Sequence, residues 1–162
     1  MAEITVVRHV VNSKDALTTM RCNELVTYQA ELVRYVLQRG PMPHAKLVKL
    51  LFLIDRELCQ RFGSMAFRWR TYKYDPLSCE VLDVVEELER DGFVVGKFVD
   101  GAVIYELTSA TPAELPQEVR EVTDQVLETW THRSLDDILT YVQSLEEVRK
   151  TWPGRRLLCA SQ

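Results

Sequence analysis

The sequence is poor in residues that mark cross-linked or flexible proteins. Its 162 residues include only six glycines, six prolines and four cysteines. With no low-complexity segment, this composition excludes a chain that is disordered over most of its length. The cysteines at positions 22, 59, 79 and 159 are widely spaced and form no C-x-x-C pair, which argues against a disulfide framework or a zinc site. We therefore expect buried free thiols.

Long apolar runs are also missing. The longest candidate, 47–54, is interrupted by Lys49 and falls short of the roughly 20 residues that a membrane-spanning helix needs. The N-terminal residues lack the basic region and the cleavage site of a signal peptide. We expect a cytoplasmic protein that has no membrane partner.

Catalytic motifs are equally scarce. The histidines, His9, His44 and His132, stand far apart, and the chain has neither a glycine-rich phosphate loop nor a G-x-S-x-G elbow. These absences favour a protein that is not an enzyme, with no catalytic residue, no metal ligand and no cofactor.

What the sequence does contain is the hydrophobic pattern of one mostly helical α+β domain over residues 1–162, with a formal net charge of -4. In the N-terminal segment 1–22, residues 4–11 are rich in β-formers and suit a short strand, whereas residues 13–20 give no firm period. Apolar residues on every side of the helix predicted over 43–62 mark it as the central one. Another helix is predicted over 23–40, and a further one begins at Asp75-Pro76 or at Ser78 and ends by Gly92. The C-terminal region 109–162 contains three more predicted helices, over 116–130, 135–142 and 145–152. For the last of these, Ser144 and Glu147 have capping-box spacing.

A β-hairpin is predicted over 93–108 because Asp100-Gly101 suits a type I′ turn. In that register one face, which we expect to be buried, carries Val94, Phe98, Val103, Tyr105 and Leu107. The order of three helices followed by a hairpin is that of a winged helix, whose third helix would read DNA. Here residues 78–91 hold six acids and one arginine, so we expect this helix to face protein or solvent and not nucleic acid.

A basic aromatic segment, residues 56–74, lies just before the acidic helix predicted over 78–91. Alternating arginines and aromatics are enriched at protein interfaces, and they also stack bases and hold phosphates. Alternatively, the aromatics pack in the core while the arginines pair with the acidic helix. The candidate partner-binding residues are Arg56, Arg61, Arg68, Trp69, Arg70, Tyr72 and Lys73.

One carboxylate, Asp55, has apolar neighbours at helical spacing on the central helix. A buried carboxylate needs a cation or several hydrogen-bond donors. The pattern therefore favours a structural Asp55, paired with an arginine or lysine or capping the following segment, over a catalytic one.

Residues 44–108 resemble the SocA-like antitoxin domain, also called the Panacea domain, and its uncharacterised prokaryotic relatives. The resemblance is carried by K-L-V-K-L-L-F-L-I-D-R-E-L from Lys46, R-F-G from Arg61, Y-K-Y-D-P from Tyr72, Ser78, and L-D-V-V-E-E-L-E-R-D-G-F from Leu82. By matching positions, Lys49, Asp55, Tyr74 and Pro76 are the family-motif residues. Asp75 replaces the usual glycine before the proline, which favours a helix cap there.

The resemblance implies an α-rich domain that acts by protein–protein contact, as an antitoxin on its toxin or as an adaptor that presents a client to a protease. We expect such a role, with the basic aromatic segment as the contact. The alternative is a winged-helix-like transcriptional regulator or another nucleic-acid-binding protein. Residues 1–73 carry twelve basic and six acidic side chains and the remainder eight and eighteen, so a second copy of the chain is also a possible partner.

Overall fold

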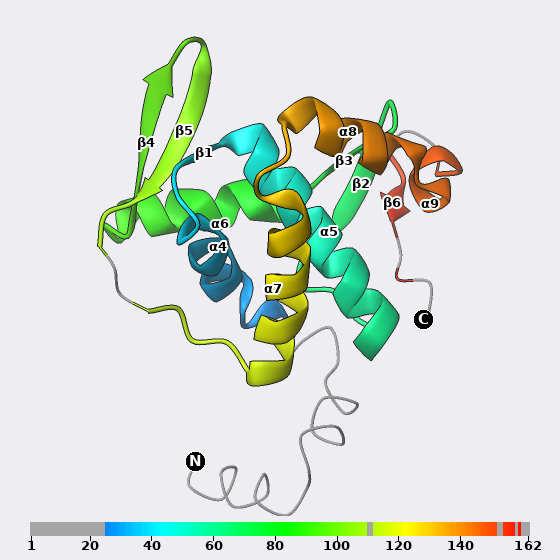
Figure 1. Ribbon diagram of the computed structural model, residues 1–162, viewed down its shortest axis with the longest axis horizontal. Helices are drawn as coiled ribbons and strands as arrows, with labels where there is room; N and C mark the ends of the chain where they lie inside the picture. The colour runs from blue at the N-terminus through cyan, green and yellow to red at the C-terminus, as the bar shows by residue number, and fades with distance from the viewer. Residues whose placement is uncertain (1–24, 110–111, 152–153, 158, 160–162) are drawn as a thin grey trace, which may run out of the picture.

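The computed structural model describes residues 25–109, 112–151, 154–157 and 159, and its elements run along the chain as shown in Figure 1. The helices and strands, in order, are α4 (Gln29–Leu37), β1 (Met42–Pro43), α5 (His44–Phe62), β2 (Trp69–Tyr72), β3 (Asp75–Leu77), α6 (Cys79–Arg90), β4 (Val94–Val99), β5 (Ala102–Leu107), α7 (Gln117–Trp130), α8 (Leu135–Ser144), α9 (Glu146–Arg149) and β6 (Arg156–Leu157). The fold is α+β and mostly helical, as the sequence predicts. The segment 1–22 lies outside the described residues.

Helix α5 is the centre of the fold (Figure 1). Every residue from Leu47 to Asp55 is buried, because α4, α7 and α8 pack against different sides of the helix. The helix ends at Gly63, whose φ of 76° is the left-handed conformation that glycine adopts without steric cost. The prediction of a central core helix is confirmed.

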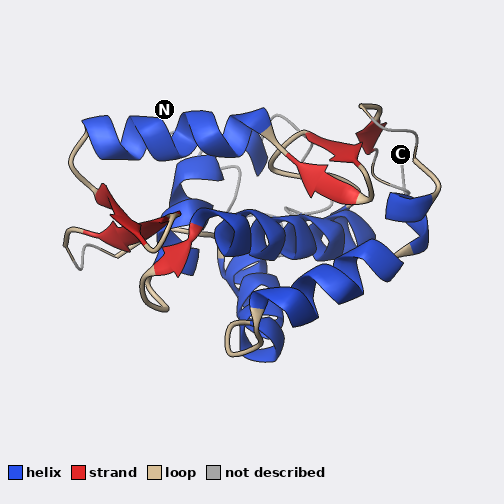
Figure 2. Ribbon diagram, turned by 90° about the horizontal axis from the view of Figure 1, so that it is seen from above, coloured by secondary structure: helices blue, strands red, loops and turns tan. Residues whose placement is uncertain are grey.

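The described strands form two antiparallel sheets at opposite ends of the helical body (Figure 2). The first has the order β1-β5-β4, and its hairpin turns at Asp100-Gly101, where both φ angles are positive. Together with α4, α5 and α6 it gives the winged-helix order of elements. The second sheet has the order β3-β2-β6 and lies partly within an insertion between α5 and α6.

Only part of the predicted hairpin face is buried. The register is as expected, with Val94 opposite Leu107 and Phe98 opposite Val103. However, Val94 is 3% exposed, whereas Phe98 is 77% exposed and Val103 37%. The reason is visible in Figure 1, where the outer half of the β4–β5 hairpin, here called the wing, extends past the helices.

Of the two starts that the sequence allowed for the helix before Gly92, the structure confirms Ser78, which is the residue before α6, whereas Asp75 and Pro76 belong to strand β3. The start predicted for the last helix is wrong. Ser144 does not cap α9, because it is the last residue of α8 and its hydroxyl donates to the carbonyl of Tyr141. The four-residue α9 is preceded by Leu145.

The expectation of four buried free thiols is also wrong. Cys59 and Cys159 form a disulfide, and Cys79 is exposed. Spacing along the chain did not indicate the disulfide, since the two residues are 100 positions apart. Cys22 lies outside the described residues. No helix in the described part of the chain is long and apolar enough to cross a membrane.

Candidate functional site

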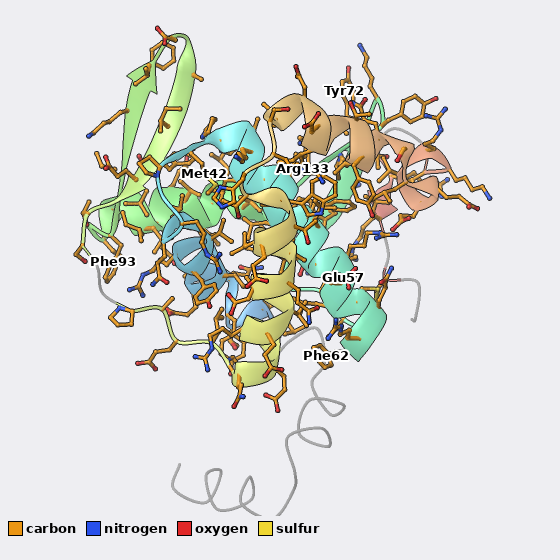
Figure 3. The ribbon with its side chains drawn as sticks, viewed as in Figure 1. Met42, Glu57, Phe62, Tyr72, Phe93 and Arg133 are labelled. Atoms are coloured by element: carbon orange, nitrogen blue, oxygen red, sulfur yellow. A yellow bond between two sulfur atoms is a disulfide. The ribbon has the colours of Figure 1, made fainter. Side chains whose placement is uncertain are left out.

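The exposed face of the sheet β3-β2-β6 gathers arginine side chains. Strand β2 alternates strictly, with Trp69 and Thr71 buried and Arg70 and Tyr72 exposed. We define the arginine face as the exposed side chains of Arg68, Arg70, Tyr72, Leu77 and Arg156. Tyr72 lies at the periphery of the molecule (Figure 3).

The strand register aligns three members of the arginine face in one row. Arg70 is opposite Leu77 on β3 and opposite Arg156 on β6. Directly opposed side chains on one face of a sheet lie within contact distance. The five residues of the arginine face also line one open hollow of about 460 Å³.

Positive charge dominates the hollow. Glu80 is the one acidic residue among the described residues that line it. Its carboxylate already accepts a hydrogen bond from the backbone N–H of Arg68 at 2.7 Å, and the Arg68 side chain is 3.8 Å away. Arg70 donates to the carbonyl of Gly154 at 2.7 Å, and Arg156 forms no ion pair with a described residue. The hollow therefore offers three guanidinium groups to an anionic ligand.

Helix α5 anchors the inner side of this sheet through three side chains, one for each strand. The first is Lys49, which is 2% exposed. Its ammonium group forms an ion pair with Asp75 at 2.6 Å and donates to the carbonyl of Pro76 at 3.2 Å. Lys49 thereby fixes β3 to α5.

The second anchor is Asp55, which is fully buried beneath β2. It accepts hydrogen bonds from the backbone N–H groups of Ala66 and Phe67 and from the indole N–H of Trp69, at 2.7 to 2.9 Å. Burial raises the pKa of this carboxyl to about 7, while the three donors act in the opposite direction. Of the structural roles that the sequence left open, the structure shows the cap on the following segment.

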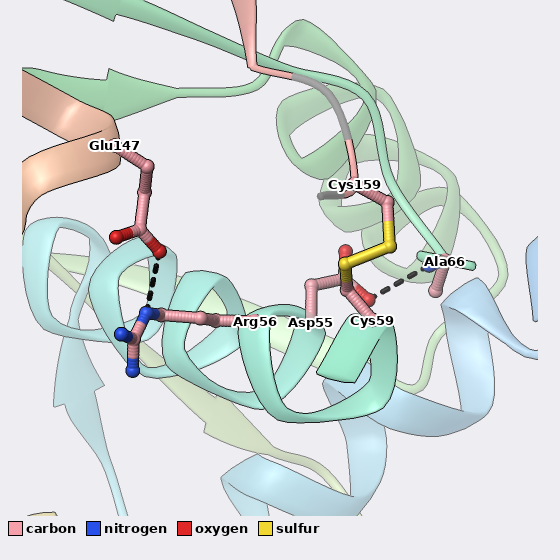
Figure 4. The surroundings of a disulfide bond; sticks show 6 residues. All are labelled: Asp55, Arg56, Cys59, Ala66, Glu147 and Cys159. Carbon is pink, nitrogen blue, oxygen red and sulfur yellow. Dashed lines mark hydrogen bonds and ion pairs between the residues drawn. A yellow bond between two sulfur atoms is a disulfide. The ribbon is translucent and has the colours of Figure 1, made fainter. Parts of the chain in front are cut away.

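The third anchor is the disulfide from Cys59, which holds Cys159 just after β6 (Figure 4). Asp55 and Cys59 are one helical turn apart on α5, so they share a face. Since β2 and β6 pair directly, with Trp69 opposite Leu157, both strands are tied to the same face of one helix. This arrangement holds the arginine face on a rigid support.

The structure separates the residues predicted as partner contacts. Arg68, Arg70 and Tyr72 lie together on the arginine face. Trp69 does not belong with them, because strand alternation turns it into the core, where its ring packs edge-on against Phe52.

Arg56 and Arg61 lie elsewhere on α5. Arg56 donates to Glu147 on α9 at 2.6 Å, and Arg61 donates to Gln125 on α7 at 2.6 Å. Neither residue lines the hollow of the arginine face.

The remaining predicted residues form the turn between β2 and β3. Lys73 and Tyr74 both have positive φ, at 53° and 64°, as a tight two-residue hairpin turn requires. The ammonium group of Lys73 lies over the Tyr72 ring, and the guanidinium of Arg149 lies over Tyr74. The predicted helix cap at Asp75 is wrong, and its carboxylate instead pairs with Lys49.

Two members of the arginine face, Leu77 and Arg156, were not predicted from the sequence. Leu77 was not considered as a strand residue because one predicted helix start was Asp75-Pro76. Arg156 lies on the arginine face only because β6 pairs with β2 from a distant part of the chain. The contact between Arg70 and Gly154, next to β6, spans 84 positions. The adjacent arginines Arg155 and Arg156 were the one local indication of a basic surface in this segment.

The acidic helix α6 does not neutralise the arginine face. Apart from Glu80, its acidic residues form no ion pair with any described residue. Asp83, Glu86 and Glu87 are exposed. Within the described residues, no group of three or more His, Cys, Asp or Glu side chains is placed to hold a metal ion.

Comparison of the chain with protein-family models, with curated proteins and with solved structures gives no match.

Proposed function

We propose that this chain is a non-enzymatic, cytoplasmic protein-binding domain that holds an acidic segment of a partner protein on the arginine face. The observation that carries the proposal is the alternation that places Arg68 and Arg70 beside Arg156 around one hollow, with Tyr72 and Leu77 at its edges. Arginine and tyrosine are the residue types that dominate binding energy at protein interfaces. In the form that the family resemblance implies, the partner is a toxin or a protease client.

A short acidic segment suits this surface better than a long polyanion does. Helix α6 begins beside the hollow, since Cys79 and Glu80 line it, and its exposed face carries Asp83, Glu86 and Glu87. A nucleic acid that continued past the arginine face in that direction would meet these carboxylates. The winged-helix order of elements is the observation that favours the alternative, a nucleic-acid-binding regulator.

The test uses a fluorescent oligoglutamate peptide and the double variant Arg68→Glu plus Arg70→Glu. We expect the variant to bind the peptide about tenfold more weakly or worse, because two attractive charges become repulsive. The matched control is Arg90→Glu plus Lys97→Glu, which makes the same change in net charge at exposed cations outside the arginine face. The control variant should retain peptide binding.

Retention of peptide affinity by the Arg68/Arg70 variant would remove the arginine face as the binding surface. A parallel titration with single-stranded and duplex DNA tests the alternative. Affinity tighter than micromolar at about 50 mM salt, lost steeply by about 200 mM, would favour the nucleic-acid-binding function.

A further inference from the structure

The Cys59–Cys159 disulfide connects the central helix to the chain just beyond strand β6 (Figure 4). Both cysteines are buried at 4% exposure. The bond closes a loop of 100 residues, and it is the one covalent link in the described structure between α5 and this C-terminal segment. Its effect is to hold the ends of two distant segments at a Cα–Cα distance of 5.5 Å.

The strand held by the disulfide is short, and in the described part of the chain it pairs with β2 over two residue pairs. Strand β6 consists of two residues, Arg156 and Leu157. Beside it, the Thr71 N–H donates to the carbonyl of Arg155 at 3.2 Å, and the Gly154 N–H donates to the carbonyl of Thr71 at 2.6 Å. The side chain of Leu157 adds apolar contact with the core. Short strands held by few backbone pairs are among the segments that open first in local unfolding.

Opening of β6 would alter the arginine face directly. Arg156 is carried by this strand, so it would leave the row that it forms with Arg70 and Leu77. Arg70 would lose the carbonyl of Gly154, which now orients its guanidinium. Two of the three arginines therefore depend on the position of β6.

We infer that the Cys59–Cys159 disulfide is a redox switch for the arginine face, an inference that rests on the proposed function of that surface. A dithiol reductant supplies two electrons and two protons, which convert the disulfide into two thiols while the reductant forms its own disulfide. Strand β6 then detaches locally, and the face loses affinity for acidic segments. Disulfides are rare in the cytosol, and those that form there are usually transient and catalytic or redox-sensing, so the proposed location favours a regulatory bond over a permanent one.

The experiment measures amide hydrogen exchange and oligoglutamate binding on the full chain, with the disulfide intact and after reduction by dithiothreitol. We expect reduction to speed exchange at Gly154 and Thr71 by about tenfold or more, while Leu50 and Ile54 in α5 stay protected. Peptide affinity should fall in the same samples. Cys159→Ser under oxidising conditions should behave like the reduced protein, and Cys79→Ser should respond to reduction as the unmodified chain does.

Equal exchange at Gly154 and Thr71 in the two redox states would overturn the switch, even if the peptide still binds. Loss of protection at Leu50 and Ile54 together with Gly154 would also overturn it, because the disulfide would then support the whole fold and not β6 alone. Failure of the proposed function looks different. In that case exchange at Gly154 responds to reduction, but the peptide binds neither form or binds both without regard to Arg68 and Arg70.

Discussion

The two three-stranded sheets differ in how the helices hold them. The sheet β3-β2-β6 rests on α5, with Lys49, Asp55 and Cys59 each anchoring one strand. The sheet β1-β5-β4 is held at its base, where Val94 and Tyr105 are buried, and its outer half extends into solvent. Both sheets show alternating side chains, so alternation alone does not decide whether a face is covered. Whether a sheet face is buried depends on which helices pack against it.

The exposed faces of the two sheets differ in chemistry as well. The anchored sheet presents arginines, whereas the wing presents Phe98, Val99 and Val103. A charged surface needs fixed geometry to hold a charged ligand, since side chains that must be ordered on binding cost free energy. The buried anchors supply that fixed geometry to the arginine face. This difference predicts that mutations at the anchors have large effects and mutations on the wing have small ones.

The largest effect is expected from Asp55. Asp55→Ala leaves the N–H groups of Ala66, Phe67 and Trp69 without their acceptor, and it should lower the free energy of unfolding by about 3 to 5 kcal/mol. Asp55→Asn should cost less, about 1 to 3 kcal/mol, because one amide oxygen still accepts while the amide nitrogen faces a donor. Denaturant unfolding measures both values.

The exposed Asp83 on α6 provides the control for this prediction, since Asp83→Asn removes the same charge without a buried partner. It should leave stability within about 0.5 kcal/mol. A normal melting temperature in Asp55→Asn, combined with loss of peptide binding, would contradict the structural role of Asp55 and indicate a direct functional one.

A smaller effect is expected from pH. Because burial raises the pKa of Asp55 to about 7, the folded protein retains a proton that the unfolded chain releases near its ordinary value of 3.8. The contribution of Asp55 to the free energy of unfolding is therefore greatest below pH 3.8 and decreases as the pH rises to about 7. Unfolding curves across this range, recorded for the unmodified chain and for Asp55→Asn, measure the contribution as the difference between the two proteins.

The comparison with Asp55→Asn is needed because His44 also makes the free energy of unfolding depend on pH. Burial, with a further contribution from Lys49, lowers the pKa of His44, so the unfolded chain binds this proton more tightly. Stability from His44 therefore rises with pH up to the ordinary value of 6.5, opposite to the contribution of Asp55. Both proteins contain His44, so its contribution cancels. Parallel pH profiles in the two proteins would show that Asp55 does not titrate in this range.

Local sequence signals predicted much of this architecture. Apolar residues around 43–62 predicted the buried α5, and Asp100-Gly101 predicted the hairpin turn and its register. The apolar neighbours of Asp55 predicted its burial and its need for donors. Each of these features depends on residues close together in sequence, where helix and turn geometry fix the spatial relation.

The features that sequence reasoning missed depend on distant pairings. Arg156 joins the arginine face, and Cys159 reaches Cys59, only because the C-terminal segment returns to β2 and α5. No periodicity in either segment encodes that return. Likewise, the burial of Phe98 was predicted from its face in the hairpin, but burial also requires a covering element, and no element among the described residues covers the wing.

The smallest effect is expected from that same Phe98. Phe98→Ser removes a large apolar side chain, yet at 77% exposure it should change the free energy of unfolding by no more than about 0.5 kcal/mol. Val94, on the same strand and the same face, is the matched control, and Val94→Ala should cost about 2 kcal/mol because its side chain is buried. Denaturant unfolding of the two variants side by side compares the buried base of the β4–β5 hairpin with the wing. Equal costs would mean that the tip of the wing is covered in solution, and the contrast between an anchored sheet and a free one would then no longer hold.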